Sequence, residues 1–173
     1  AIAALPSLAA EWLPRVIAEF RALYPGVGLN LFDVVLERTL SLVREGTVDL
    51  AINANVGLDE EFDTRPLFDD GFFLVCRPDH PLARRRSIRL EALSGLAYIH
   101  SIRSASMWQL LYPHLREVPL RDTGIEVSYL STLAGLFANG LGVSVVTGVS
   151  LFNFTRVGLC FVRVDDDGLR YQV

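Results

Sequence analysis

The order in which strand-like and helix-like segments alternate is the feature that most constrains the fold of this chain. Short apolar runs typical of buried strands lie at residues 1–5, 27–34 and 48–52. Segments with apolar residues at helical spacing separate these runs, at about 7–24 and 36–46. Strands joined by helices favour a parallel sheet with right-handed crossovers. The sequence therefore predicts an α/β fold.

The same plan restarts after a stiff connector. The strand-like residues 72–77 are followed by Pro78-Asp79-His80-Pro81, and two prolines in four residues suggest a boundary between two lobes. Further strands are expected at 97–100, 125–129, 143–147 and 159–164, and helices from about 104 to Pro113 and at 131–139. We therefore expect a second α/β lobe.

Composition narrows the class of protein. The chain has 173 residues, 51% of them hydrophobic and 21% charged, which is typical of a globular protein with an apolar interior. No apolar run approaches the roughly 20 residues that span a bilayer. The net charge is −4, and the one basic cluster, Arg84–Arg86 with Arg89 nearby, is expected to be a solvated loop. This chain should therefore not bind nucleic acid by itself.

The reactive side chains do not form a catalytic pattern. The sequence contains no lysine, which removes Schiff-base chemistry, and no serine, histidine and aspartate show the spacing of a triad. Cys76 and Cys160 each lie in an apolar run and are interpreted as buried thiols in a reducing compartment. We expect neither enzymatic activity nor a metal or other cofactor.

Hydroxyl side chains recur where helices begin after strands. Ser7 follows the first strand, His100 to Ser104 follow another, and Ser131-Thr132 follow a third. Helix N-termini carry unpaired N–H groups and a partial positive charge, so they suit a carboxylate or phosphate. In open α/β sheets, ligands gather at the carboxyl ends of strands. This pattern favours binding of a small anion over turnover.

Several longer segments carry a family resemblance. The segments LPSLAAEWLPRVIAEFRALYPGVGLNL, LSLVREGTVDLAI, RPLFDDGFFLVCRPDHPLA and LAGLFANGLGVSVV resemble, in order, the effector-binding domain of LysR-type transcriptional regulators. The resemblance covers nearly the whole chain. It implies a two-lobed type 2 periplasmic-binding-protein-like fold whose lobes are joined by two crossover strands.

The resemblance also implies boundaries. Lobe I would comprise residues 1–76 and 164–173, and lobe II residues 77–163. The crossovers would lie at 73–77 and near 160–164, which would make Cys76 and Cys160 near neighbours with reduced thiols. Both ends look cut, and the N-terminal winged helix-turn-helix of such regulators is absent from this chain.

The effector contacts follow by analogy with the family. They are Pro6, Ser7, Val35, Leu36, Asn53, His100, Ser101, Ser131, Thr132 and Thr147. Ser7 and Thr132 would donate hydrogen bonds to an effector carboxylate, and Arg103 would either add charge or lie exposed in its loop. The apolar Val35 and Leu36 would accept a ring or an alkyl group. Thr147 would face the cleft or start the next turn, and His100 would serve the site or the fold.

The implied partners are a small-molecule effector, a second copy of the chain and, through the missing domain, DNA. The family pairs its sensor domains, so we expect a homodimer that uses the helices at 9–24 and 131–139. The full-length protein could also form a tetramer. Effector binding would act allosterically in the cytoplasm, without a membrane. The alternative is a solute-binding protein of a transporter.

Overall fold

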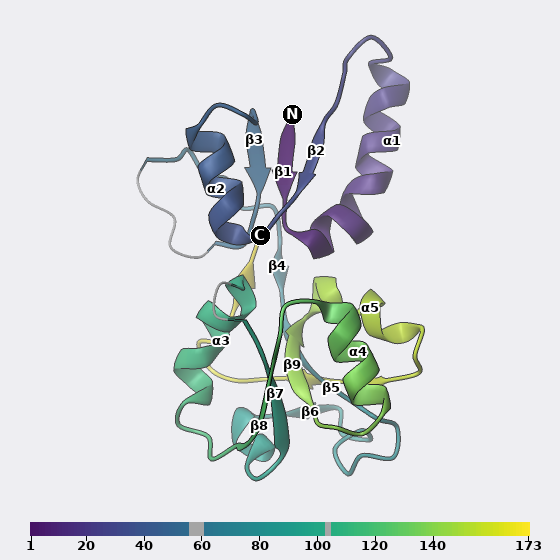
Figure 1. Cartoon of the computed structure of the whole chain (residues 1–173), viewed down its shortest axis with the longest axis vertical. Coiled ribbons are helices and arrows are strands. Elements are labelled where there is room, and N and C mark those ends of the chain that lie inside the picture. The colour runs from purple at the N-terminus through teal and green to yellow at the C-terminus, as the bar shows by residue number, and fades with distance from the viewer. Residues whose placement is uncertain (56–60, 103–104) are drawn as a thin grey trace.

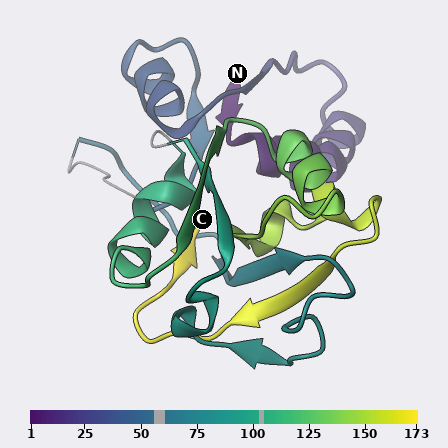
Figure 2. The ribbon, with the colours of Figure 1, turned by 60° about the horizontal axis from the view of Figure 1, so that its bottom comes forward.

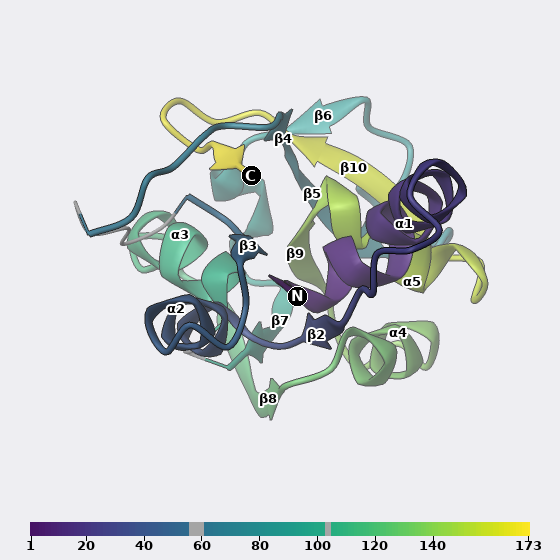
Figure 3. The ribbon, with the colours of Figure 1, turned by 90° about the horizontal axis from the view of Figure 1, so that it is seen from above.

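The first lobe is a short parallel sheet between two helices. The computed structural model describes residues 1–55, 61–102 and 105–173. Its first sheet has the order β2-β1-β3, built from β1 (Ile2–Ala4), β2 (Leu31–Asp33) and β3 (Leu50–Ile52). Both pairings are parallel, with Ala3 opposite Phe32 and Ala51. The helices α1 (Leu13–Leu23) and α2 (Leu36–Arg44) flank this sheet (Figure 3), so the α/β prediction is confirmed here.

The start of the first helix differs from the prediction. A π-helical segment, η1 (Leu8–Trp12), runs directly into α1, and Pro14 lies in the first turn of α1. Ser7, the residue before η1, has helical backbone angles, and its side chain makes no capping hydrogen bond. Its hydroxyl is instead paired with that of Ser150.

The second lobe contains a mixed sheet of order β6-β10-β5-β9. Its strands are β5 (Phe72–Cys76), β6 (Ser87–Ile88), β9 (Ser144–Thr147) and β10 (Cys160–Val164). A parallel pair, β7 (Ala97–Ser101) and β8 (Arg121–Val127), lies beside it through a bridge between Tyr98 and Val143. The helical segments are η2 (Leu90–Leu93), α3 (Ser106–Leu115), α4 (Leu130–Ala138), η3 (Gly148–Ser150) and α5 (Phe152–Thr155). Pro113 lies inside α3, which continues beyond it to Leu115.

The connection between the lobes is a two-stranded ribbon. β4 (Asp69–Asp70) and β11 (Tyr171–Gln172) pair antiparallel between the upper and lower parts of the molecule (Figure 1). The expected crossovers at 73–77 and 160–164 coincide instead with β5 and β10, which pair with each other inside the second sheet. Their apolar side chains are buried there, with Leu74 and Val162 at 0% exposure. Strand pairing places residues 72–76 in the same sheet as β9 and β10, and the lobe boundaries themselves stay a prediction.

The buried core joins the two lobes. Its main cluster combines second-lobe residues such as Phe72, Val145 and Val162 with Leu5, Leu8 and Leu36 of the first lobe. A smaller cluster of Ala3, Leu42 and Val48 lies under α2. Among the described residues, no helix combines the length and apolar character needed to cross a bilayer.

Candidate functional site

A cavity of about 540 Å³ lies where the two lobes meet. This volume is within the usual range for small-molecule sites, roughly 300–1,000 Å³. Its walls come from the start of η1, the end of β2, the segments that precede α3 and α4, and the η3 turn. The polar side chains that line it are Ser7, Asp33, Ser101, Ser106, Ser128, Tyr129, Ser131, Thr147, Ser150, Asn153 and Tyr171.

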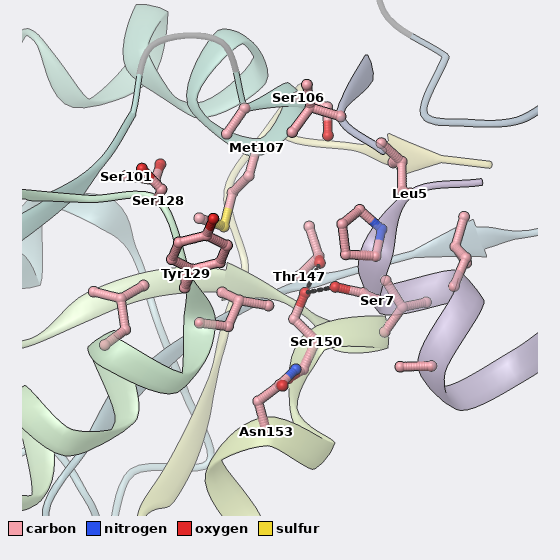
Figure 4. Close-up of a pocket in the computed structure, with 18 of the residues that line it drawn as sticks. Leu5, Ser7, Ser101, Ser106, Met107, Ser128, Tyr129, Thr147, Ser150 and Asn153 are labelled. Carbon is pink, nitrogen blue, oxygen red and sulfur yellow. Dashed lines mark hydrogen bonds between the residues drawn. The ribbon is translucent and has the colours of Figure 1, made fainter. Parts of the chain in front are cut away.

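A chain of three hydroxyl groups crosses from one lobe to the other (Figure 4). The Ser7 Oγ lies 3.1 Å from the Ser150 Oγ, which lies 2.8 Å from the Thr147 Oγ1. Thr147 and Ser150 are only 3% and 4% exposed. Each hydroxyl can donate one hydrogen bond and accept two, so the chain keeps hydrogen-bonding capacity for a ligand. The three groups also tie η1 to the end of β9.

The crossover ribbon positions this hydroxyl chain. The Asp70 carboxylate on β4 accepts hydrogen bonds from the backbone N–H groups of Gly71, at 2.7 Å, and Val149, at 2.8 Å. Val149 lies in the η3 turn, next to Ser150. A Cβ on Gly148 would overlap the Asp70 carboxylate, so this close approach requires glycine. The crossover strand β4 is therefore in direct contact with the η3 turn of the site.

The second crossover strand reaches the same cavity. Tyr171 of β11 lines it, pairs in register with Asp70, and meets the Phe72 ring edge-on at 5.9 Å between centroids. Burial raises the pKa of Tyr171, and a hydrogen bond with Ser106 partly offsets that effect. At neutral pH the phenol is thus a neutral hydrogen-bonding group at the cavity wall.

The electrostatic character of the cavity comes from dipoles rather than cations. Among the lining residues that the structure describes, Asp33 at the end of β2 is the one with a formal charge at neutral pH. The helices α3 and α4 begin at the cavity, and neither has a side-chain cap on its first-turn N–H groups. Those N–H groups can donate hydrogen bonds to an anion. Arg103, a possible source of positive charge, lies outside the described residues.

The structure brings most of the predicted site residues together. Seven of them line the interlobe cavity: Pro6, Ser7, Val35, Leu36, Ser101, Ser131 and Thr147. Thr147 faces the cavity rather than only starting a turn.

Three predicted residues lie elsewhere. Asn53 lines a separate cavity of about 440 Å³, and its side-chain amide donates to the Leu36 carbonyl and to the Thr39 hydroxyl. His100 lies beside the Tyr98 ring, with 4.9 Å between the ring centroids, and lines a separate small cavity with Trp108 and Tyr112. Thr132 is exposed on α4 and is absent from the cavity linings found in the described part of the chain.

Other lining residues were not anticipated from the sequence. Ser128, Tyr129 and Ser150 all follow strands, so the rule that ligands gather at carboxyl ends of strands could have identified them. Met107 and Tyr171 carried no such signal. Their positions depend on how α3 and the crossover ribbon pack against the second lobe. In the described residues there is also no cluster of three or more histidine, cysteine or carboxylate side chains suited to a metal ion.

These features define the class of fold to which the chain belongs. Two α/β lobes joined by a crossover ribbon, with a polar cavity between them, form a small-molecule-binding fold of the type 2 periplasmic-binding-protein kind. The chain belongs to the LysR substrate binding domain family, whose family model matches residues 1–173.

Curated relatives and solved structures agree with this family. An uncharacterized HTH-type transcriptional regulator, YbhD of Escherichia coli, is 32% identical over 152 residues, covering 87% of this chain and 48% of the relative. A hydrogen peroxide-inducible genes activator of Dickeya chrysanthemi is 26% identical over 167 residues, covering 93% and 53%. The chain thus spans about half the length of these relatives.

The solved structures most relevant here have closely similar folds. A Corynebacterium glutamicum OxyR C206 mutant superposes with a TM-score of 0.85 at 25% identity, covering 99% of this chain and 55% of that one. The Synechocystis CcmR regulatory domain in complex with 2-PG gives 0.82 at 24% identity, covering 99% and 83%.

Proposed function

We propose that this chain is the effector-sensing part of a LysR-type transcriptional regulator. An effector would bind in the interlobe cavity, and its binding would be passed to DNA through a separate domain. The observation that carries the proposal is the hydroxyl chain of Ser7, Ser150 and Thr147, which spans both lobes at the cavity wall. A ligand that engages these groups contacts both lobes and so favours one relative arrangement.

The effector class follows from the lining. A small carboxylate suits the first-turn N–H groups of α3 and α4 together with the hydroxyl groups, because all of these can donate to an anion. Val35, Leu36 and Met107 provide an apolar surface for a ring or an alkyl body. The transporter alternative is less favoured, because the relatives named above are transcriptional regulators.

The test is a thermal-shift screen of small carboxylates on the parent and on three variants. Ser7→Ala and Ser150→Ala each remove a hydroxyl from the cavity. Thr132→Ala, which removes an exposed hydroxyl outside it, is the matched control. Loss of one hydrogen bond to a charged group costs about 1.5–3 kcal/mol, so affinity for a hit should fall at least about tenfold in both cavity variants. Equal affinity in all four proteins would contradict the proposed site.

We also infer that α1 provides a surface for a second copy of the chain. Val16, Phe20 and Leu23 lie on one face of this helix, and Leu23 is 73% exposed. The helix expected to join it, α4, buries Leu133 and Phe137 within its own lobe, so its apolar stripe is already covered. The dimer surface is therefore assigned to α1.

A further inference from the structure

The two cysteines of the chain are direct neighbours on adjacent strands. Cys76 is the last residue of β5 and Cys160 the first of β10, and they are register partners in this antiparallel pair. The two strands run side by side in the second lobe (Figure 2). The expectation that the cysteines are near neighbours is thus confirmed, and both are free thiols.

The strand geometry suits a covalent bond between them. Register partners in antiparallel strands have Cα atoms about 4.5–5.5 Å apart, and disulfides span about 4.4–6.8 Å. Side chains of register partners also point to the same face of the sheet. That face carries Leu74 and Val162, both fully buried, so the thiols lie at the end of an apolar row.

The two thiols differ in their surroundings. Cys76 is 0% exposed, whereas Cys160 is only partly buried. Burial raises the pKa of Cys76 to about 11, with smaller contributions from Cys160 and Asp79. Because the thiolate is the reactive form, Cys76 is protected from direct attack by an oxidant. Cys160 is therefore the thiol that an oxidant in solution meets first.

We propose that Cys76 and Cys160 form an intramolecular cross-strand disulfide when a peroxide oxidises Cys160. In the first step the Cys160 sulfur takes one oxygen of the peroxide, the O–O bond breaks, and water leaves, which produces a sulfenic acid. In the second step the Cys76 sulfur attacks the Cys160 sulfur. The S–S bond forms, and the hydroxyl leaves as water with the Cys76 proton. Two thiols are oxidised by two electrons in total, and one hydrogen peroxide is reduced to two water molecules.

The test treats the folded chain with hydrogen peroxide and quenches it in acid before mass spectrometry under non-reducing conditions. We expect the monomer to lose two hydrogen atoms, and tryptic peptide 157–163 to be linked to the peptide that carries Cys76. Dithiothreitol should restore the reduced mass. Because the bond closes the long loop of residues 77–159 in the unfolded chain, Tm should rise by roughly 5–15 °C.

Two variants separate the steps. In Cys76→Ala, Cys160 should be trapped by a sulfenic-acid reagent such as dimedone, because the second thiol is missing. In Cys160→Ala, Cys76 should stay reduced after the same exposure. The proposal is overturned if the parent keeps two alkylatable thiols after peroxide, if Cys160 oxidises further without a cross-link, or if only intermolecular disulfides appear.

Discussion

At the residue scale, the burial of Cys76 makes the free energy of unfolding depend on pH in the alkaline range. The native state holds this thiol neutral up to a pKa of about 11, whereas an exposed cysteine ionises from about pH 8.5. The unfolded chain therefore binds fewer protons between these values. The Cys76 contribution to stability is complete below the unfolded pKa and is lost as pH rises through the native pKa.

We predict that the free energy of unfolding of the parent falls between about pH 8.5 and 11, and falls less in Cys76→Ala. Tyr98 and Tyr171 act in the same direction at higher pH, because burial raises the pKa of both phenols. The measurement is urea unfolding under reducing conditions across this pH range. Parallel declines in parent and variant would show that Cys76 is not responsible.

At the scale of elements, the η3 turn is the point where the crossover ribbon meets the site. β4 holds this turn through the Asp70 carboxylate, and the turn presents Ser150 to the cavity. Val149 of this turn also packs against the main core cluster. The position of the turn beside β4 depends in addition on the Asp70 hydrogen bond to Val149 and on the lack of a side chain at Gly148.

We predict that Gly148→Ala destabilises the fold by about 1–3 kcal/mol, because the new methyl group must displace the Asp70 carboxylate. The matched control is Gly135→Ala on α4, where an added Cβ meets no atom within 4 Å. That change should stabilise the protein by about 0.5–1 kcal/mol, because alanine favours helix. Urea denaturation measures both. Similar destabilisation by the two changes would refute the steric explanation.

At the scale of the whole molecule, α1 carries an apolar face that the fold leaves exposed. Val16 and Leu23 are 44% and 73% exposed, although both are large and apolar. The rest of the first lobe is small, and its helices flank a sheet of only three short strands. We expect an exposed apolar face of this kind to contact a second copy of the chain, because that contact removes its side chains from water.

We predict that the chain forms a dimer at micromolar concentration and that Leu23→Glu weakens it at least about tenfold, because the change places a charge in an apolar contact. Leu67→Glu, which changes another half-exposed leucine away from α1, is the control. Sedimentation velocity measures the association. A parent that stays monomeric, or equal weakening by both changes, would count against this surface.

Local sequence determined much of the secondary structure. The apolar runs at 1–5, 48–52 and 143–147 contain β1, β3 and β9. Short apolar runs of this kind are typical of buried strands, and the pattern can be read from consecutive residues alone. The missing N–H of Pro14 left two alternatives, a first helical turn or a kink, and the structure places it in the first turn of α1. The family resemblance supplied the ten expected effector contacts, and seven of them line the interlobe cavity.

Tertiary structure alone decided which distant groups meet. Ser7 and Ser150 are separated by 143 positions, and Asp70 and Val149 by 79, so no local pattern reports these hydrogen bonds. The same holds for the pairing of β4 with β11, which joins residues 69–70 to residues 171–172. The sequence by itself determined the elements and the kind of polar groups at their ends. The packing of the lobes decided the pairing of the strands and the hydroxyl chain, because those contacts exist only once the two halves are in place.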